Sequence, residues 1–222
     1  MRKLRLHDIL IIIVCFGSVL KSHGQDPARF QREVDSIVAL NHSVEKSNLI
    51  LFTGSSSIRM WSNLKTTFPN HNVINLGFGG SEMADLLYYV DKIILSFLPG
   101  QVFIYEGDND ISFGRTTDQI LSKAESILLQ VRKKLPDTEI IFISAKPSIA
   151  RWKLKDKYEA FNKQLLAWTK KKERVKYADV WTPMLDKKGN VRHDIFIEDG
   201  LHLNEKGYEI WTKLLGGYLN GK

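Results

Sequence analysis

Short apolar runs alternate with longer segments of helical periodicity along most of the chain. The apolar runs lie at 49–52, 73–76, 102–105, 139–144 and, more weakly, 175–180. Segments in which apolar residues recur at three- and four-residue steps lie at about 27–40, 82–97, 117–134, 154–172 and 204–219. Buried strands that alternate with such helices are joined by crossovers, which form a parallel sheet with helices on both faces. The pattern therefore predicts an α/β domain with three layers.

A single domain of this kind is expected to follow the first residues. The 222 residues include 43% hydrophobic residues, enough for a full core. No linker, repeat or low-complexity tract divides the sequence.

The N-terminus has the order of a secretory signal peptide. Arg2, Lys3 and Arg5 precede an apolar stretch at 9–20, which is shorter than the about 20 residues that a membrane-spanning helix needs. Small residues at 22 and 24 place the predicted cleavage before Gln25, so 1–24 is the predicted leader and 25–222 the mature domain. The protein is therefore expected to be secreted or periplasmic, and the alternative is an uncleaved leader that anchors it in a membrane.

Removal of the leader also changes the cysteine content and the charge. Cys15 is the only cysteine, so the mature chain would contain no disulfide. Lipid attachment to Cys15 is disfavoured by Val14, which stands where such signals have a small residue. The leader contains four basic residues and one acidic residue, so the net charge of +7 falls to about +4. This charge does not indicate nucleic-acid binding, and no stable membrane insertion is expected after cleavage.

Residues that could take part in catalysis or binding follow the predicted strands. The segment "TGSSS" follows the first strand, "GFGGSE" the second and "GDNDI" the third, while "EDGLHLNEKGY" precedes the last helix. Each segment alone has a structural explanation, as a helix cap, a tight turn or an Asx-turn. However, parallel sheets bind ligands at the carboxyl ends of their strands. The four segments would bring a hydroxyl, backbone donors, an amide and an acid with an imidazole to that edge.

These four ordered segments make the chain similar to the SGNH hydrolases, the GDSL-type esterase and lipase family. Within that family the chain resembles the platelet-activating-factor acetylhydrolase-like and carbohydrate-esterase branches. The resemblance covers about 47–220. It implies a flavodoxin-like α/β/α sandwich with a parallel sheet of about five strands.

Each block of the family pattern has a counterpart in this sequence. The nucleophile position of F-x-G-D-S is Ser56, the oxyanion glycine is Gly80, and the asparagine of G-x-N is Asn109. The acid and the base of D-x-x-H are Asp199 and His202. The resemblance implies that His202 deprotonates Ser56 and that Asp199 orients the imidazole. The N–H groups of Ser56 and Gly80, with the Asn109 amide, would bind the oxyanion.

The chain departs from the family pattern at Ser55, where relatives have an aspartate that supports the loop. Ser55 is expected to act through the stability of that loop. Because of this departure, Ser57 or Ser55 remains a minor alternative to Ser56 as the nucleophile.

Two groups of acidic residues raise the question of a metal site. They are Glu106, Asp108 and Asp110, and Asp194, Glu198 and Asp199. Their spacing is not that of a calcium loop, and the sequence has no two-histidine zinc motif. The resemblance also implies no metal or organic cofactor. Asp108 and Asp110 are expected to cap the loop beside Asn109.

Three side chains near these loops are candidates for contacting substrate. Arg151 and Trp152 follow the fourth predicted strand, and Trp61 follows the nucleophile block. Indoles stack on sugar rings or acyl groups, and arginine binds carboxylates and phosphates. The alternative for all three is ordinary packing at the start of a helix.

The expected activity is that of a secreted serine esterase acting on short-chain, above all acetyl, esters of a carbohydrate or glycoconjugate. Its partner would be a small-molecule or glycan ester, and the sequence carries no information on oligomeric state. One alternative is a lysophospholipase or thioesterase for longer acyl chains. The other is a glycan-binding module that keeps the fold without activity, which the replacement at Ser55 makes conceivable.

Overall fold

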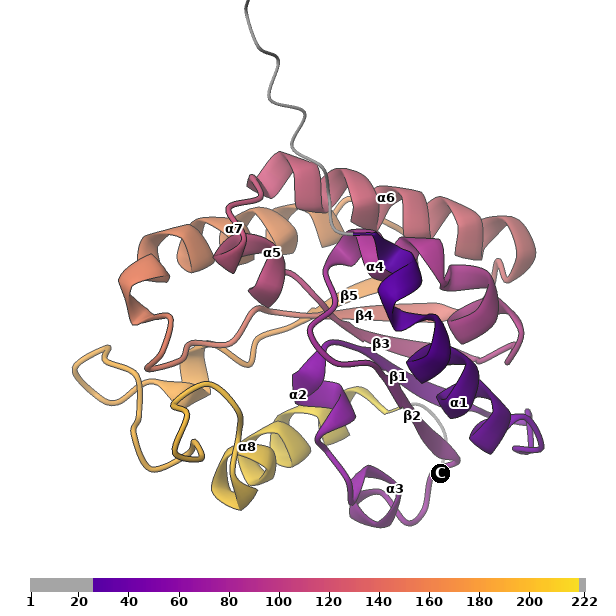
Figure 1. Cartoon of the computed structure of the whole chain (residues 1–222), viewed down its shortest axis with the longest axis horizontal. Helices are drawn as coiled ribbons and strands as arrows, with labels where there is room; N and C mark the ends of the chain where they lie inside the picture. Colours follow the sequence, from indigo (N-terminus) through magenta and orange to yellow (C-terminus); the bar gives the residue numbers. More distant parts are fainter. Residues whose placement is uncertain (1–25, 220–222) are drawn as a thin grey trace, which may run out of the picture.

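The computed structural model describes residues 26–219, which form a parallel sheet of five strands between layers of helices (Figure 1). The strand order is β2-β1-β3-β4-β5, and all neighbouring strands are parallel. The strands are β1 Ile50–Gly54, β2 Val73–Gly77, β3 Gln101–Tyr105, β4 Glu139–Ile143 and β5 Val175–Ala178. This confirms the predicted three-layer α/β fold. The predicted leader, including Cys15, lies outside the described residues.

The strands are apolar at nearly every position because both faces of the sheet are covered. Successive side chains of a strand point to opposite faces. Leu51 accordingly packs in the core on one side of the sheet, while Phe52 packs in the core on the other. The central strand β1 pairs with both β2 and β3, with Ile50 opposite Val73 and Gln101.

The two longest helices lie on one face of the sheet and the last helix lies on the other (Figure 1). On the first face lie α1 Gln31–Asn41, α4 Met83–Tyr88, α5 Asp108–Ser112, α6 Thr117–Lys134 and α7 Lys155–Thr169. On the second lie α2 Ser56–Arg59, α3 Leu64–Thr67 and α8 Glu205–Leu215. Short 3-10 turns occupy Pro27–Phe30, Trp152–Leu154, Thr182–Met184 and Gly216–Tyr218.

Helix α6 shows why the periodicity predicted helices well. Its start is fixed by a capping box, in which the Thr116 hydroxyl accepts from the Gln119 N–H and the Gln119 side chain accepts from the Thr116 N–H. Its buried residues are Ile120, Ala124, Ile127, Leu128 and Val131, spaced by three or four positions. Because this spacing puts them on one side of a helix, that side packs against the sheet.

The predicted helix at 82–97 is interrupted. Helix α4 ends at Tyr88, and the chain then forms a π-helical turn over Asp91–Leu95, in which the Ser96 N–H donates to the Asp91 carbonyl. The apolar side is kept through the break, because Leu86, Val90 and Ile93 are all buried. The pattern therefore predicted which side is buried but not the change of helix type. It also missed α2, α3 and α5, which are too short to show a period.

The end of β1 determines where the following helix begins. Gly54 has a φ of +127°, and a Cβ there would lie 2.1 Å from the Tyr105 carbonyl oxygen of β3. Only glycine accommodates this approach. The next N–H, of Ser55, donates to the same carbonyl at 3.0 Å, and α2 starts at Ser56. The second serine of the "SSS" run is thereby placed at a strand-to-helix corner.

No helix within residues 26–219 combines the length and the apolar character needed to cross a membrane.

Candidate active site

The candidate site lies at the carboxyl ends of β1 and β3, which pair as far as Gly54 and Tyr105. The connections that leave these two strands run to opposite faces of the sheet, and parallel sheets bind ligands at such a point. Ser56 follows β1, Gly80 follows β2 and Asn109 follows β3. The structure thus places all three at one edge of the sheet.

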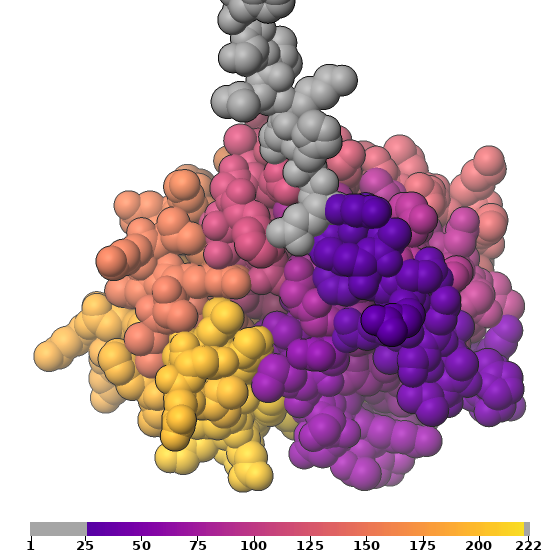
Figure 2. Space-filling view, in the orientation of Figure 1, coloured from indigo at the N-terminus to yellow at the C-terminus, as the bar shows by residue number. Residues whose placement is uncertain are grey.

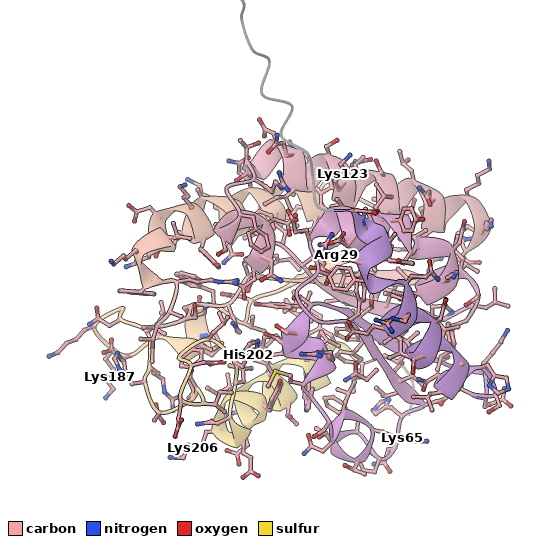
Figure 3. All side chains as sticks on the ribbon, in the orientation of Figure 1. Arg29, Lys65, Lys123, Lys187, His202 and Lys206 are labelled. Atoms are coloured by element: carbon pink, nitrogen blue, oxygen red, sulfur yellow. The ribbon has the colours of Figure 1, made fainter. Side chains whose placement is uncertain are left out.

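Ser56, His202 and Asp199 form a continuous hydrogen-bonded series. Ser56 Oγ lies 2.9 Å from His202 Nε2, across 146 positions of sequence. His202 Nδ1 lies 2.5 Å from Asp199 Oδ2. His202 lies beside α2 (Figure 3), and the C-terminal residues pack against those that follow β1 (Figure 2). The Ser56–His202 distance suits direct proton transfer between Oγ and Nε2.

Asp199 is fixed by its own loop. Its Oδ1 accepts hydrogen bonds from the N–H groups of Leu201, at 2.8 Å, and His202, at 2.9 Å, which leaves Oδ2 for the imidazole. Burial raises the pKa of the carboxyl, but the hydrogen bonds from His202 and Leu201 outweigh it and lower the pKa of Asp199 to about 2. Asp199 is therefore ionised at neutral pH, so it accepts from Nδ1–H and leaves Nε2 free to accept from Ser56.

Two backbone N–H groups after β1 and β2 are available to an oxyanion. Gly80 has a φ of +77°, and a Cβ there would meet no atom within 4 Å. Within residues 26–219, the N–H groups of Ser56 and Gly80 have no hydrogen-bond acceptor. The neighbouring N–H, of Gly79, is instead bound by Glu33 Oε1 at 3.0 Å. Glu33 thereby holds the loop while the Gly80 N–H stays free.

The Asn109 side chain is held on both sides. Its Nδ2 donates to Ser55 Oγ at 2.6 Å and to the Ser81 carbonyl at 2.9 Å. Its Oδ1 accepts from Arg151 Nη2 at 2.9 Å. An amide nitrogen has two hydrogens, so an oxyanion must share or replace one of these two acceptors before Asn109 can bind it.

The Arg151 side chain, which was expected to contact substrate, is bound within the protein. Its side chain is only 16% exposed, and Nη1 donates to Asp108 Oδ1 at 2.7 Å while Nη2 bonds to Asn109. The guanidinium is therefore engaged with the two residues that begin α5.

Trp152 lies beside a hollow next to the loop of Asp199. Its ring stacks on Trp181 with a centroid separation of 6.1 Å, and Lys155 Nζ lies 5.1 Å from its centroid. Trp152 also lines a cavity of about 470 Å³ with Ile149, Asp186, Asn190, Val191 and His193. A substrate contact for Trp152 stays a prediction.

Trp61 is almost completely buried, and its expected substrate contact stays a prediction. Its side chain is 1% exposed, and its ring packs against Phe52, Tyr208 and Trp211. Helix α2 is a single turn, so the chain returns at once to the face of the sheet that α8 covers. Trp61 therefore belongs to the hydrophobic core.

The two aspartates beside Asn109 differ in role. Asp110 caps the loop as expected, since it accepts from the N–H groups of Gly107 and Met83 at 3.1 Å. Asp108 instead forms a buried ion pair with Lys146, whose side chain is fully buried. Lys146 was not among the predicted site residues, although a lysine within three positions of the end of a buried strand was an available signal.

No group of three or more His, Cys, Asp or Glu side chains in the described part of the chain is arranged to hold a metal ion. Of the acidic residues near Asn109, Asp110 accepts from the Gly107 N–H and Asp108 forms an ion pair with Lys146.

Comparison of the sequence with known families agrees with this geometry. Residues 35–210 match the GDSL-like lipase/acylhydrolase family. The chain belongs to this family. Membership assigns it, at the family level, to the esterases and acylhydrolases. A comparison with curated proteins gave no match.

Solved structures of GDSL-like proteins have the same fold. A Streptococcus pneumonia protein, provisionally named a platelet activating factor, is 25% identical, with a TM-score of 0.76 over 86% of this chain and 95% of its own. A GDSL-like lipase from Bacteroides thetaiotaomicron is 20% identical, with a TM-score of 0.73 over 87% and 98%. A carbohydrate esterase family 3 protein from Talaromyces cellulolyticus is 19% identical, with a TM-score of 0.63 over 77% and 95%.

Proposed function

We propose that the protein is an exported serine esterase that hydrolyses acetyl or similarly short acyl esters of a carbohydrate or glycoconjugate. The observation that carries the proposal is the series from Asp199 through His202 to Ser56, with separations of 2.5 Å and 2.9 Å. Such a series activates a hydroxyl for attack on a carbonyl carbon. The family membership of the chain supports the same reaction class.

In the first half of the reaction, Ser56 becomes acylated. As Oγ bonds to the ester carbonyl carbon, its proton passes to His202 Nε2. The tetrahedral intermediate then breaks its bond to the alcohol oxygen, which takes the proton from Nε2 and leaves. In the second half, His202 deprotonates a water molecule that attacks the acyl-serine, and the proton returns to Ser56 as the carboxylic acid departs.

The N–H groups of Ser56 and Gly80 bind the negative oxygen in both tetrahedral intermediates, and the Asn109 amide adds a third donor. Removing one donor of this kind typically costs about 3 to 4 kcal/mol of transition-state stabilisation. Because the two backbone groups have no acceptor within residues 26–219, neither has to break a hydrogen bond to bind the oxyanion. Asn109 needs one exchange of partners.

The carbohydrate part of the proposal is supported by a cavity at Trp152. The cavity of about 470 Å³ combines the Trp152 indole with polar groups of Asp186, Asn190 and His193. Aromatic surface with a few polar groups suits a sugar ring and its hydroxyls. The likeness to a carbohydrate esterase, at 19% identity, is a likeness of fold.

A second cavity favours the alternative of longer acyl chains. It measures about 880 Å³, and its lining includes Met60, Trp61, Ile197 and Leu203 among polar side chains. Leu203 is next to His202 in sequence, and Met60 and Ile197 are partly exposed. An acyl chain beyond a few carbons would find apolar surface there. Chain-length preference therefore separates the two proposals.

The test begins with labelling by a serine-reactive fluorophosphonate. The expected result is one adduct on Ser56, and folded protein without an adduct would favour the glycan-binding module. Hydrolysis of p-nitrophenyl esters from acetyl to decanoyl, followed by acetylated sugars, then gives the acyl length and the alcohol. Highest kcat/KM for decanoyl esters would replace the short-chain proposal by the lipase-like one.

Export has its own test because it depends on the predicted leader. N-terminal sequencing of the protein from its native host should begin at Gln25. A chain that begins at Met1, or one with lipid on Cys15, would contradict the proposed soluble exported form.

A further inference from the structure

Arg151 joins the two residues that begin helix α5. Nη1 donates to Asp108 Oδ1 at 2.7 Å, and Nη2 donates to Asn109 Oδ1 at 2.9 Å. The side chain comes from the loop after β4, more than 40 positions away, and is 16% exposed. One planar guanidinium therefore holds the carboxylate of Asp108 and the amide of Asn109 at a fixed separation.

Asp108 is itself held too firmly to move with Arg151. Its Oδ1 also accepts from the Tyr158 hydroxyl at 2.5 Å. Its Oδ2 accepts from the Tyr105 hydroxyl at 2.9 Å and from Lys146 Nζ at 3.1 Å. Because Asp108 is shared with a second, fully buried cation, it does not cancel the whole charge of Arg151. Positive charge remains next to the Asn109 carbonyl oxygen.

This contact decides which way the Asn109 amide faces. A guanidinium only donates hydrogen bonds, so the amide oxygen must face Arg151 and the NH₂ group must face Ser55 and Ser81. A flipped amide would set donor against donor at Arg151. Arg151 thus fixes the Asn109 amide in the orientation that the oxyanion site requires, with the NH₂ group on the side away from the guanidinium.

The same contact increases the polarity of the donor. A positive charge beside an amide oxygen draws electron density from the amide nitrogen. Each N–H of the amide then becomes a stronger donor, as in other chains of polarised hydrogen bonds. An effect of this kind matters most when the acceptor is the developing oxyanion of the transition state.

We propose that Arg151 is a positioning residue for ester hydrolysis, which fixes and polarises the Asn109 amide as the third oxyanion donor. This inference rests on the proposed esterase function of Ser56. It assigns to Arg151 a role in the transition state in place of substrate binding.

The test compares Arg151→Ala with Arg151→Lys on p-nitrophenyl acetate. We expect kcat of Arg151→Ala to fall by at least about tenfold with little change in KM, because an oxyanion donor acts mainly in the transition state. Arg151→Lys should recover part of the loss through its charge. Guanidinium ion at millimolar concentration should restore activity to Arg151→Ala, since it can occupy the vacated position.

A trifluoromethyl ketone supplies an independent measurement, because it adds to the serine and forms a tetrahedral oxyanion. Its inhibition constant should rise by the same factor as kcat/KM falls across the Arg151 variants. A merely structural residue would not produce this proportionality.

Arg132→Ala is the matched control. Arg132 is also partly buried, and its guanidinium donates to the carbonyls of Thr138, Glu173 and Arg174, in the loops before β4 and β5. This variant should have a lower Tm than wild type but the same kcat and the same inhibition constant. Guanidinium ion should not change its activity.

The outcomes are separable. A rise in KM at unchanged kcat would overturn the inference and restore Arg151 to substrate binding. Unchanged kcat and inhibition constant with a lower Tm, as in Arg132→Ala, would make Arg151 purely structural. Wild-type protein that neither hydrolyses esters nor reacts with fluorophosphonate would overturn the proposed function and this inference together, whereas active wild type with an unaffected Arg151→Ala would overturn the inference alone.

Discussion

Asn109 Nδ2 donates a 2.6 Å hydrogen bond to Ser55 Oγ, and Ser55 stands at the aspartate position of the F-x-G-D-S pattern that the sequence resembles. The replacement therefore keeps an acceptor for the amide while it removes a negative charge beside the oxyanion site. Ser55 is 2% exposed, so water does not readily substitute for its hydroxyl. The structure gives Ser55 a defined target, Asn109, in addition to the general support of the loop that the sequence suggested.

Ser55→Ala should lower kcat by about tenfold at nearly constant KM, because the Asn109 amide loses one of its two acceptors and its position becomes less defined. Steady-state kinetics on p-nitrophenyl acetate measure this. Thr53→Val is the matched control, since it removes another buried hydroxyl, which donates to the Leu76 carbonyl at 3.0 Å. An effect of Ser55→Ala on Tm alone, like that expected of Thr53→Val, would contradict the role of Ser55.

Ser56→Ala should lower kcat by at least about a thousandfold without unfolding the protein, because members of a triad act as a unit. Ser57→Ala should lower kcat far less, since the His202 ring is hydrogen-bonded to Ser56. Kinetics of both variants, with Tm as the folding control, test the order. Near-full activity of Ser56→Ala would show that the nucleophile lies elsewhere.

Trp61→Ala should destabilise the protein by about 3 to 5 kcal/mol, because it removes a large side chain that is 1% exposed. Urea denaturation measures the loss, and Trp61→Phe supplies a milder variant if the first does not fold. Kinetics of the folded fraction should be unchanged.

Trp152→Ala is the contrast, since Trp152 is partly exposed and lines a cavity. This variant should have a higher KM for acetylated sugars. A higher KM for Trp61→Phe would restore Trp61 to the substrate wall.

The sequence predicted those parts of the structure that depend on local pattern. The strand positions follow from apolar runs, and the short spacing of Asp199 and His202 allows contact within one loop. It did not predict the contact between Arg151 and Asn109, because that contact depends on side-chain conformations across two loops that follow different strands. The burial of Trp61 was not predicted because nothing in the sequence shows that α2 ends after a single turn.

The last prediction concerns Glu106 and its effect on the pH dependence of stability. Glu106 is 1% exposed, its Oε1 accepts from the Ser81 hydroxyl at 2.6 Å, and its Oε2 has no partner within the described residues. Burial, helped by the nearby charge of Asp110, raises the pKa of Glu106 well above its ordinary value. The folded state therefore holds the proton more tightly than the unfolded state.

For such a group, the free energy of unfolding decreases as the pH rises above the unfolded pKa of 4.5, until the folded pKa is passed. Glu106→Gln keeps an acceptor for Ser81 and cannot ionise, so its stability relative to wild type should increase with pH, by up to about 1.4 kcal/mol per pH unit in that window. Urea denaturation between about pH 5 and about pH 9 measures the difference. Asp110, whose pKa burial raises to about 7, leaves a residual slope in both proteins. Glu159→Gln, at an exposed glutamate of α7, should show no such trend, and a pH-independent difference for Glu106→Gln would mean that Glu106 is ionised in the folded protein.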